Sequence, residues 1–168
     1  MRLTFEIADA GPLDAEELLA VKDQGWREAY THVFSPEFLA GLGREPGRTE
    51  RWRRLLAGDG GAHFAVGRTD GRIVGMAGAG PALEGAPAPE EVYTVYVLAE
   101  VYGTGLARAL TERVIGDRPA FLWVLEDNPR AIAFYTKLGF APDGTREFFE
   151  ADGKQVPEIR MVRRGSTP

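Results

Sequence analysis

Gly103, Thr104 and Gly105 form the segment of this sequence that is best suited to bind an anion. Val92–Leu98 before them is a β-branched and aromatic run, which predicts a buried strand. After them, apolar residues recur at helical spacing from Leu106. The first N–H groups of a helix lack internal partners, the helix dipole is positive there, and glycine lets a phosphate come close to the backbone. The sequence therefore predicts a phosphate or pyrophosphate site, although many strand–turn–helix units with two glycines are ordinary turns.

A second strand–helix unit lies farther along the chain. Phe121–Leu125 is an apolar run of strand length. Asn128 and Pro129 are typical of a helix start, with Asn as the N-cap and Pro in the first turn. Gly139 suits the residue that ends this helix. The two units together predict a pair of strand–helix elements in direct succession.

The two units carry sequence motifs of a known family. The pattern N-x-x-A-x-x-F-Y-x-x-L-G-F, which begins at Asn128, resembles the second signature of the GNAT family of acyl-CoA-dependent N-acyltransferases. Tyr102-x-x-Gly105-x-Ala107 resembles the family's pyrophosphate loop, [QR]-x-x-G-x-[GA], and the motifs follow in the family's order and spacing. Tyr102 stands where Gln or Arg is usual, and Ala99 where Pro is frequent. Tyr102 removes one polar side chain near the loop but leaves the backbone N–H groups in place.

The resemblance implies a fold as well as a function. It predicts an α/β protein with a mixed, mostly antiparallel sheet of about seven strands, flanked by about four helices. In this family the fourth and fifth strands splay apart. We expect residues 1–168 to form one such domain.

The resemblance also places the cofactor, acetyl-CoA. Backbone groups of the loop would wrap its pyrophosphate, and those of the fourth strand would pair with its pantetheine arm. The loop residues are Gly103, Thr104, Gly105, Leu106, Ala107 and Arg108, and the strand residues are Val95, Tyr96 and Val97. Asn128 would also contact the cofactor arm, although its position as an N-cap accounts for it equally well.

Tyr135 matches the position of the family's general acid. A phenol with a pKa of about 10 is protonated at neutral pH and can donate a proton to a departing thiolate. A tyrosine at this place in a helix can also be an ordinary packing residue. The resemblance favours the catalytic role.

The general base is less well defined by the sequence. Some family members have a glutamate on the fifth strand, five residues before the Asn, but here that residue is Trp123. Others have one at the start of the fourth strand, which corresponds to Glu91. Strict alternation along the strand would place Glu91 on the face of Tyr93, Val95 and Val97, and a surface charge is an equally good interpretation. Glu126, at the end of the fifth strand, is a weaker alternative.

Several aromatic residues are candidates for the acceptor pocket. In the family, the helical region after the first strand forms one wall of this pocket. Trp26, Tyr30 and Phe34 lie in that region, and Tyr93 and Trp123 lie on the two splayed strands. Each of the first three could instead be a core residue at helical spacing.

The remaining elements follow from local patterns. Leu3–Ala8 alternates as a first strand, Asp14 and Glu17 form a possible capping box for the next helix, and Gly25 could kink that helix. A further helix is expected over Arg48–Leu56. Asp70-Gly71 and Asp152-Gly153 predict two hairpin turns.

Composition excludes several classes of function. The 168 residues have a net charge of −5, which gives no general attraction to nucleic acid or anionic membranes. There is no cysteine, so disulfides and a cysteine nucleophile are excluded, and the two histidines lie far apart, so we expect no metal site. No apolar run suits a signal peptide or membrane span. We expect a cytoplasmic protein and leave a homodimer open.

The leading functional prediction is an N-acetyltransferase that acts on the primary amine of a small molecule. The amine would attack acetyl-CoA directly in a ternary complex. One alternative is a non-catalytic acyl-CoA sensor, and another is acetylation of a protein or peptide amine. A nucleotide-binding protein with the same loop is a minor alternative, because the chain lacks the G-x-G-x-x-G and G-K-[ST] motifs.

Overall fold

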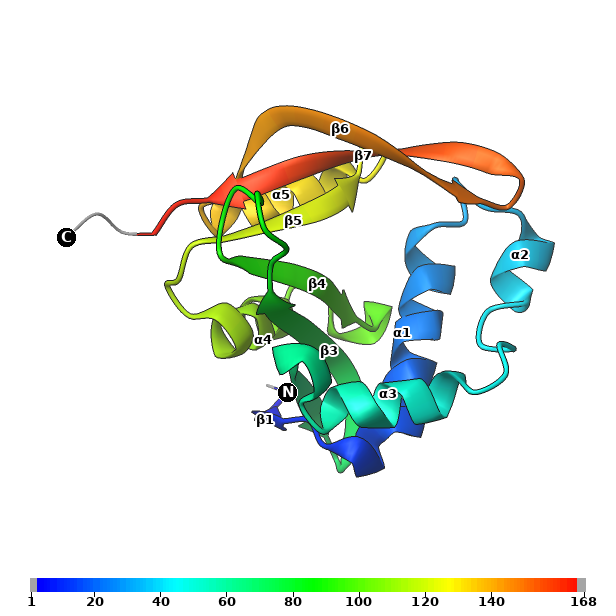
Figure 1. Ribbon diagram of the computed structural model, residues 1–168. Helices are drawn as coiled ribbons and strands as arrows, with labels where there is room; N and C mark the ends of the chain where they lie inside the picture. The colour runs from blue at the N-terminus through cyan, green and yellow to red at the C-terminus, as the bar shows by residue number, and fades with distance from the viewer. Residues whose placement is uncertain (1–2, 166–168) are drawn as a thin grey trace.

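The computed structural model describes residues 3–165. Its strands form one seven-stranded sheet (Figure 1). The strands are β1 (Glu6–Asp9), β2 (His63–Thr69), β3 (Arg72–Pro81), β4 (Glu90–Val97), β5 (Ala120–Leu125), β6 (Ala141–Ala151) and β7 (Lys154–Arg163). Their order is β1-β2-β3-β4-β5-β7-β6, and every neighbouring pair is antiparallel except β4 and β5. The predicted mixed, mostly antiparallel sheet is confirmed.

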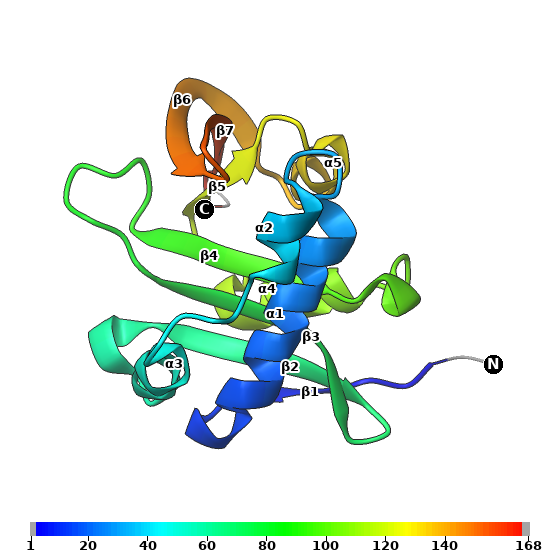
Figure 2. The same cartoon turned by 90° about the vertical axis from the view of Figure 1, so that its right-hand side faces the viewer.

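Helices cover both faces of the sheet. They are α1 (Ala15–Ala29), α2 (Pro36–Ala40), α3 (Arg48–Leu56), α4 (Leu106–Ile115) and α5 (Pro129–Lys137). Against one face, α1 brings Gly25 so close to Tyr96 that an added Cβ would lie 2.9 Å from the ring. Against the other, α4 places Leu106 and Leu110 over Gly75 of β3. Figure 2 shows α1 and α4 on opposite sides of the central strands.

The start of α1 differs from the expected capping box. A short 3₁₀ turn, Pro12–Asp14, precedes the helix, and the Asp14 carboxylate accepts a hydrogen bond from the Gly11 amide at 2.9 Å. Glu17 accepts instead from the backbone N–H of Ile73 on β3, at 2.8 Å. Both side chains have partners outside the helix, so they do not cap it. Gly25 does not interrupt α1; it provides room for the Tyr96 ring.

The two predicted hairpin turns are present. Asp70 and Gly71 have φ angles of 50° and 78°, and Asp152 and Gly153 have 53° and 68°. Two consecutive positive φ angles are the conformation that brings antiparallel strands back with their natural twist. The first turn also explains why β1 begins at Glu6 rather than Leu3, because Glu6 pairs with Arg68 just before β2 ends.

β4 and β5 separate along most of their length, as predicted. Within residues 3–165 they pair only at Glu91 and Phe121. The other edge of β5 is paired with β7 from Ala120 to Leu125, and the other edge of β4 is paired with β3. The backbone groups of β4 and β5 beyond the Glu91–Phe121 pair therefore face a gap in the sheet.

Candidate active site

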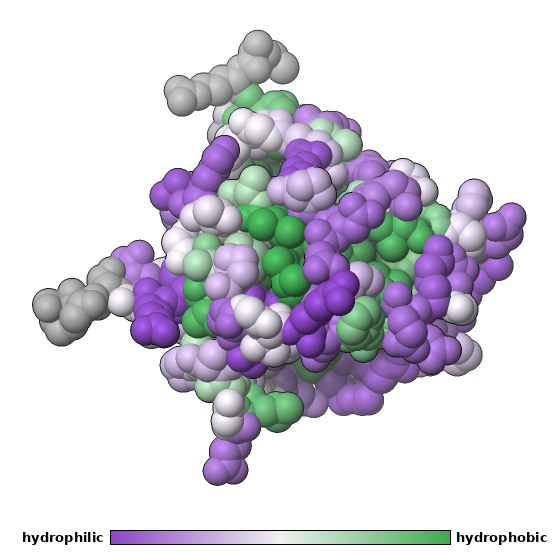
Figure 3. Space-filling model, turned by 90° about the horizontal axis from the view of Figure 1, so that it is seen from above, coloured by the Kyte–Doolittle hydropathy of each residue, from purple (hydrophilic) through white to green (hydrophobic). Residues whose placement is uncertain are grey.

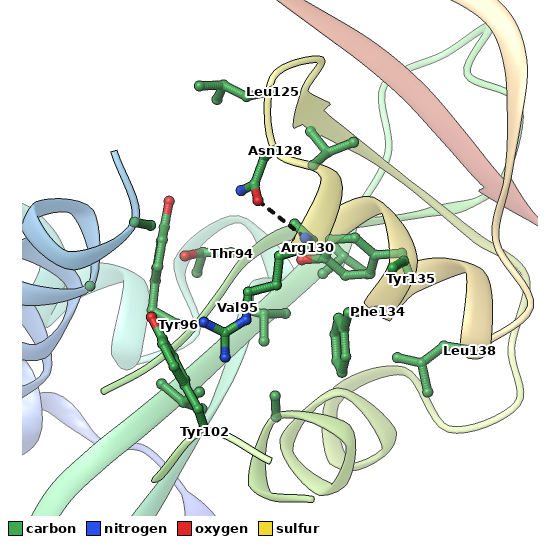
Figure 4. Close-up of a pocket in the computed structure, with 18 of the residues that line it drawn as sticks. Thr94, Val95, Tyr96, Tyr102, Leu125, Asn128, Arg130, Phe134, Tyr135 and Leu138 are labelled. Atoms are coloured by element: carbon green, nitrogen blue, oxygen red, sulfur yellow. Dashed lines mark hydrogen bonds between the residues drawn. The ribbon is translucent and has the colours of Figure 1, made fainter. Parts of the chain in front are cut away.

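A cavity of about 860 Å³ lies at the gap between β4 and β5 (Figure 4). Its walls come from α1, β4, the Gly103 loop, the start of α4, β5, α5, β6 and β7. The lining includes most residues that the sequence singled out: Trp26, Tyr30, Tyr93, Val95, Tyr96, Val97, Gly103, Gly105, Leu106, Ala107, Arg108, Trp123, Asn128 and Tyr135. Thr104, Phe34 and Glu91 do not line it. One cavity thus joins the predicted anion loop to the predicted acceptor wall.

The anion loop, residues 103–108, has the left-handed backbone conformation at its glycines that lets a ligand approach closely. Gly103 and Gly105 have φ angles of +75° and +88°, and a Cβ added at either would meet no atom within 4 Å. The hydrogen bonds of residues 3–165 leave the amides of Gly103, Gly105, Ala107 and Arg108 without an acceptor. Free N–H groups at a helix N-terminus, beside open space, form an anion-binding site. The Thr104 hydroxyl is used within the loop, where it donates to the Val101 carbonyl at 2.7 Å.

Arg130 is a cation at this end of the cavity that the sequence reasoning missed. Its guanidinium carbon lies 3.3 Å from the centroid of the Tyr102 ring, so the two groups are stacked, as Figure 4 shows. Both residues line the cavity, and Arg130 has no carboxylate partner within the described residues. The tyrosine that replaces the usual Gln or Arg thus positions a cation from α5 beside the loop. The sequence signal that could have identified Arg130 is its position two residues after Asn128, in the first turn of the helix that borders the site.

The β4 edge and Asn128 lie between the loop and Tyr135. Val95, Tyr96 and Val97 line the cavity at the point where β4 has no strand beside it. The Asn128 side-chain oxygen accepts from the Ala131 amide at 3.1 Å, which is the dashed bond in Figure 4. Asn128 therefore caps α5, and its NH₂ group, which lies near the Tyr30 hydroxyl, has two hydrogens and so retains one for a ligand.

Tyr135 lies on α5 with its ring directed toward the cavity (Figure 4). It is 9% exposed and makes edge-to-face contacts with Phe134 and Phe140 at centroid distances of 5.1 and 5.8 Å. Burial, and then the nearby Tyr30, raise the pKa of Tyr135 well above its usual value. The phenol therefore stays protonated across the neutral range and can act only as a proton donor there.

A β-bulge changes the face on which Glu91 lies. Gly80 and Gly78 of β3 pair with Glu91 and Thr94 of β4, so that Tyr93 is the extra residue. The expected alternation fails at this point, because the bulge puts Glu91 on the same face as Thr94 instead of opposite to it. Tyr93 also lies on this face, since an added Cβ on Gly80 would meet its hydroxyl at 2.6 Å. Val95 and Val97, which strict alternation groups with Glu91, lie on the other face.

The acceptor end of the cavity has aromatic walls. Trp26, Tyr30, Tyr93 and Trp123 line it. Phe34 lies behind this wall, 3% exposed, with its ring stacked on Trp26 at 5.5 Å. It belongs to the hydrophobic cluster that contains Tyr30 but does not line the cavity, so Phe34 supports the wall and does not form part of it.

Three carboxylates near the acceptor end differ in their surroundings. Glu126 is bound to Arg146 at 2.6 Å. Glu91 is half-buried, and burial and the charge of Glu147 raise its pKa. Glu158, which the sequence reasoning missed, lines the cavity from β7. Burial, and then Glu147 and Glu91, raise the pKa of Glu158 to about 7.

The surface outside the cavity gives few further indications. Seen from the side of β6 and β7, small apolar areas alternate with hydrophilic side chains (Figure 3). Over residues 3–165, no helix has the length and hydrophobicity needed to cross a membrane. In the same range, no cluster of three or more His, Cys, Asp or Glu residues is arranged to hold a metal ion. The homodimer stays a prediction.

Comparisons with known proteins agree with these features. Residues 26–140 match the acetyltransferase (GNAT) family. An uncharacterised N-acetyltransferase of Mycobacterium tuberculosis is 33% identical over 141 residues, which are 80% of this chain and 88% of the relative. A mycothiol acetyltransferase from a Parafrankia species is 48% identical over 63 residues, which are 33% of this chain and 20% of that protein.

The fold is also that of solved acetyltransferases. The PaiA N-acetyltransferase of Thermoplasma acidophilum, crystallised with coenzyme A, superposes with a TM-score of 0.75. The two proteins are 17% identical, and the superposition covers 96% of this chain and 99% of the other. At this identity the likeness concerns the fold alone.

Proposed function

Because this chain belongs to the GNAT acetyltransferase family, we propose that it transfers an acetyl group from acetyl-CoA to the primary amine of a small molecule. It is an acyl-CoA-dependent N-acetyltransferase; the small-molecule acceptor and the roles of individual residues are the proposal. The observation that carries it is the single cavity that contains free loop amides, the unpaired β4 edge and Tyr135. A ternary complex with direct attack needs a pocket of this kind.

The residues at the loop end fit coenzyme A. Free amides at the start of α4 and the Arg130 guanidinium suit a pyrophosphate, and the unpaired β4 edge suits an amide-containing arm. Bound acetyl-CoA supplies a thioester whose carbonyl carbon an amine can attack. Asn128 would hold the arm through its NH₂ group.

Tyr135 would protonate the sulfur as the amine displaces it. Its raised pKa keeps the phenol protonated at neutral pH, so that a proton is available to the sulfur while the carbon–sulfur bond breaks. The phenol needs no activation for this role. The aromatic rings at the acceptor end would exclude water and shape the entry for the amine.

A thiol-release assay with acetyl-CoA and a panel of small amines tests the proposal. We expect thiol release that depends on the amine and equals the amount of acetylated amine found by mass spectrometry. A matching panel of lysine-containing and free N-terminal peptides should react much more slowly. Coenzyme A binding without thiol release from any acceptor would favour the sensor, and faster reaction of a peptide would favour a protein substrate.

Arg130 provides a prediction about the cofactor. Replacing Arg130 with Gln should weaken coenzyme A binding about tenfold, which corresponds to about 1.4 kcal/mol for a lost charged contact to phosphate. Affinity for pantetheine, which has no phosphate, should not change. Calorimetry with both ligands separates the two effects, and Arg113→Gln, an exposed arginine on α4 paired with Asp9, is the control. An equal loss for both ligands would show that Arg130 acts only by shaping the cavity.

A further inference from the structure

We propose that Glu158 is the residue that binds and deprotonates the acceptor ammonium, and that the acceptor is an amine with at least one further positive charge. The inference rests on the proposed acetyl transfer and names the substrate class of the same site. It assigns the base to a strand that the sequence motifs do not reach.

The strand register places Glu158 at the acceptor end. It lies on β7 directly opposite Leu125 of β5 and Glu147 of β6. Directly opposed residues point to the same face of a sheet, and Trp123, two residues before Leu125, shares that face. Glu158 and Trp123 both line the cavity. The carboxylate therefore faces the space in which the acceptor must approach the thioester.

Glu158 and its two acidic neighbours, Glu91 and Glu147, have no direct cationic partner among the described residues. Within residues 3–165, Glu91, Glu147 and Glu158 take part in no salt bridge, because the nearby arginines have other partners. Arg160, next along the Glu158 face of β7, binds Asp143 at 2.6 Å, and Arg146 binds Glu126 at 2.6 Å. Glu147 is exposed, so water screens part of its charge. The remaining negative potential favours a ligand with more than one positive charge.

Thr94 is a second, independent indication of a polar ligand. Its side chain lines the cavity, is 9% exposed, and its hydroxyl has no hydrogen-bond partner among the described residues. A buried hydroxyl without a partner is costly, and a ligand N–H would satisfy it.

The proton movements balance for this arrangement. The amine nitrogen forms a bond to the acetyl carbon while the carbon–sulfur bond breaks. The ammonium loses two protons in becoming an amide: the first goes to Glu158 and on to solvent, and the second replaces the proton that Tyr135 gives to sulfur. The products are the acetylated amine, the free thiol and one released proton.

The groups around Glu158 set the pH dependence. Glu91 on β4 and Glu147 on β6 add to the effect of burial and raise its pKa to about 7. Tyr30, the C-cap residue of α1, faces Glu158, since burial and then the charge of Glu158 raise the pKa of Tyr30. Lys22 on α1 and Tyr135 on α5 line the same cavity, and Arg160 lies two residues from Glu158 on β7. A base works only when ionised, so turnover should rise with pH through about 7. Loss of the Glu147 charge should lower the pKa of Glu158.

The test measures kcat/KM against pH with 1,4-diaminobutane and with butylamine. The parent protein should prefer the diamine by about tenfold or more. Glu158→Gln should lower kcat/KM for the diamine by about ten- to a hundredfold and remove the fall in kcat/KM below pH of about 7, which is the acidic limb of the pH profile. Glu147→Gln should retain activity but move the limb to lower pH. Glu150→Gln, on the same hairpin but outside the cavity, should behave as the parent does.

The possible outcomes separate this inference from the proposed function. Coenzyme A affinity measured on Glu158→Gln controls for folding. A parent-like rate and a parent-like acidic limb of the pH profile in Glu158→Gln would overturn the role of Glu158. Equal use of the two amines by the parent would overturn the acceptor class. Acetyl transfer itself would stand in either case. If the parent released no thiol with any amine, acetyl transfer itself would fail and this inference with it.

Discussion

Tyr135→Phe should slow acetyl transfer in a single turnover by about ten- to ten-thousand-fold. The substitution keeps the ring and its contacts with Phe134 and Phe140 but removes the only proton that the side chain can give. Because burial raises the pKa of Tyr135, the parent profile should have no basic limb from this residue in the neutral range. Single-turnover rates are the appropriate measurement, since slow product release could hide the effect in the steady state.

Two observations control for damage to the Tyr135→Phe variant. Coenzyme A affinity and the melting temperature should stay close to those of the parent, because the removed hydroxyl lies at the cavity surface and the ring remains packed. Parent-like single-turnover chemistry would reject the assignment and make water the proton donor.

Gly105→Val should weaken coenzyme A binding by roughly a hundredfold or more. A Cβ on Gly105 meets no protein atom within 4 Å, so the added side chain occupies the space in which the phosphates would lie. Two lost charge-assisted hydrogen bonds of about 1.5 kcal/mol each give this magnitude. Isothermal calorimetry measures the affinity directly.

The control for Gly105→Val is a second glycine with the same backbone. Gly58 has φ and ψ angles of 100° and 10°, against 88° and −2° for Gly105, and it also precedes a helical turn with open space around it. Gly58→Val should carry a similar strain of about 1–2 kcal/mol, because valine tolerates positive φ poorly, but should bind coenzyme A as the parent does. An equal loss of affinity in both variants would assign the effect to backbone strain alone.

Much of the fold was predictable because its signals are local. The Asp-Gly turns, the N-cap at Asn128 and the glycines of the loop each act through the conformation of a few neighbouring residues. Those signals located both strand–helix units and Tyr135. The capping box at Asp14 failed because Gly11 and Ile73 offered partners that sequence spacing does not reveal.

The parts that could not be predicted depend on register and on contacts between distant elements. The bulge at Tyr93 exists only in relation to β3, yet it decides the face of Glu91. Glu158 reaches the cavity because β7 lies between β5 and β6, an order that local patterns do not encode. Arg130 and Tyr102 meet because α5 and the loop lie on opposite sides of the same cavity. Side-chain periodicity within one segment carries none of this information.

Within residues 3–165, β4 and β5 pair only at Glu91 and Phe121, so the sheet consists of two halves that are weakly joined along the line between these strands, the seam. A pantetheine arm bound along β4 would bridge this seam, so the free energy of cofactor binding would also oppose its opening. Mass action then adds about 2.7 kcal/mol of stability at a hundred times the dissociation constant. The supply of acetyl-CoA would thereby control two quantities together: the rate of acetylation and the fraction of molecules whose seam is open to proteases.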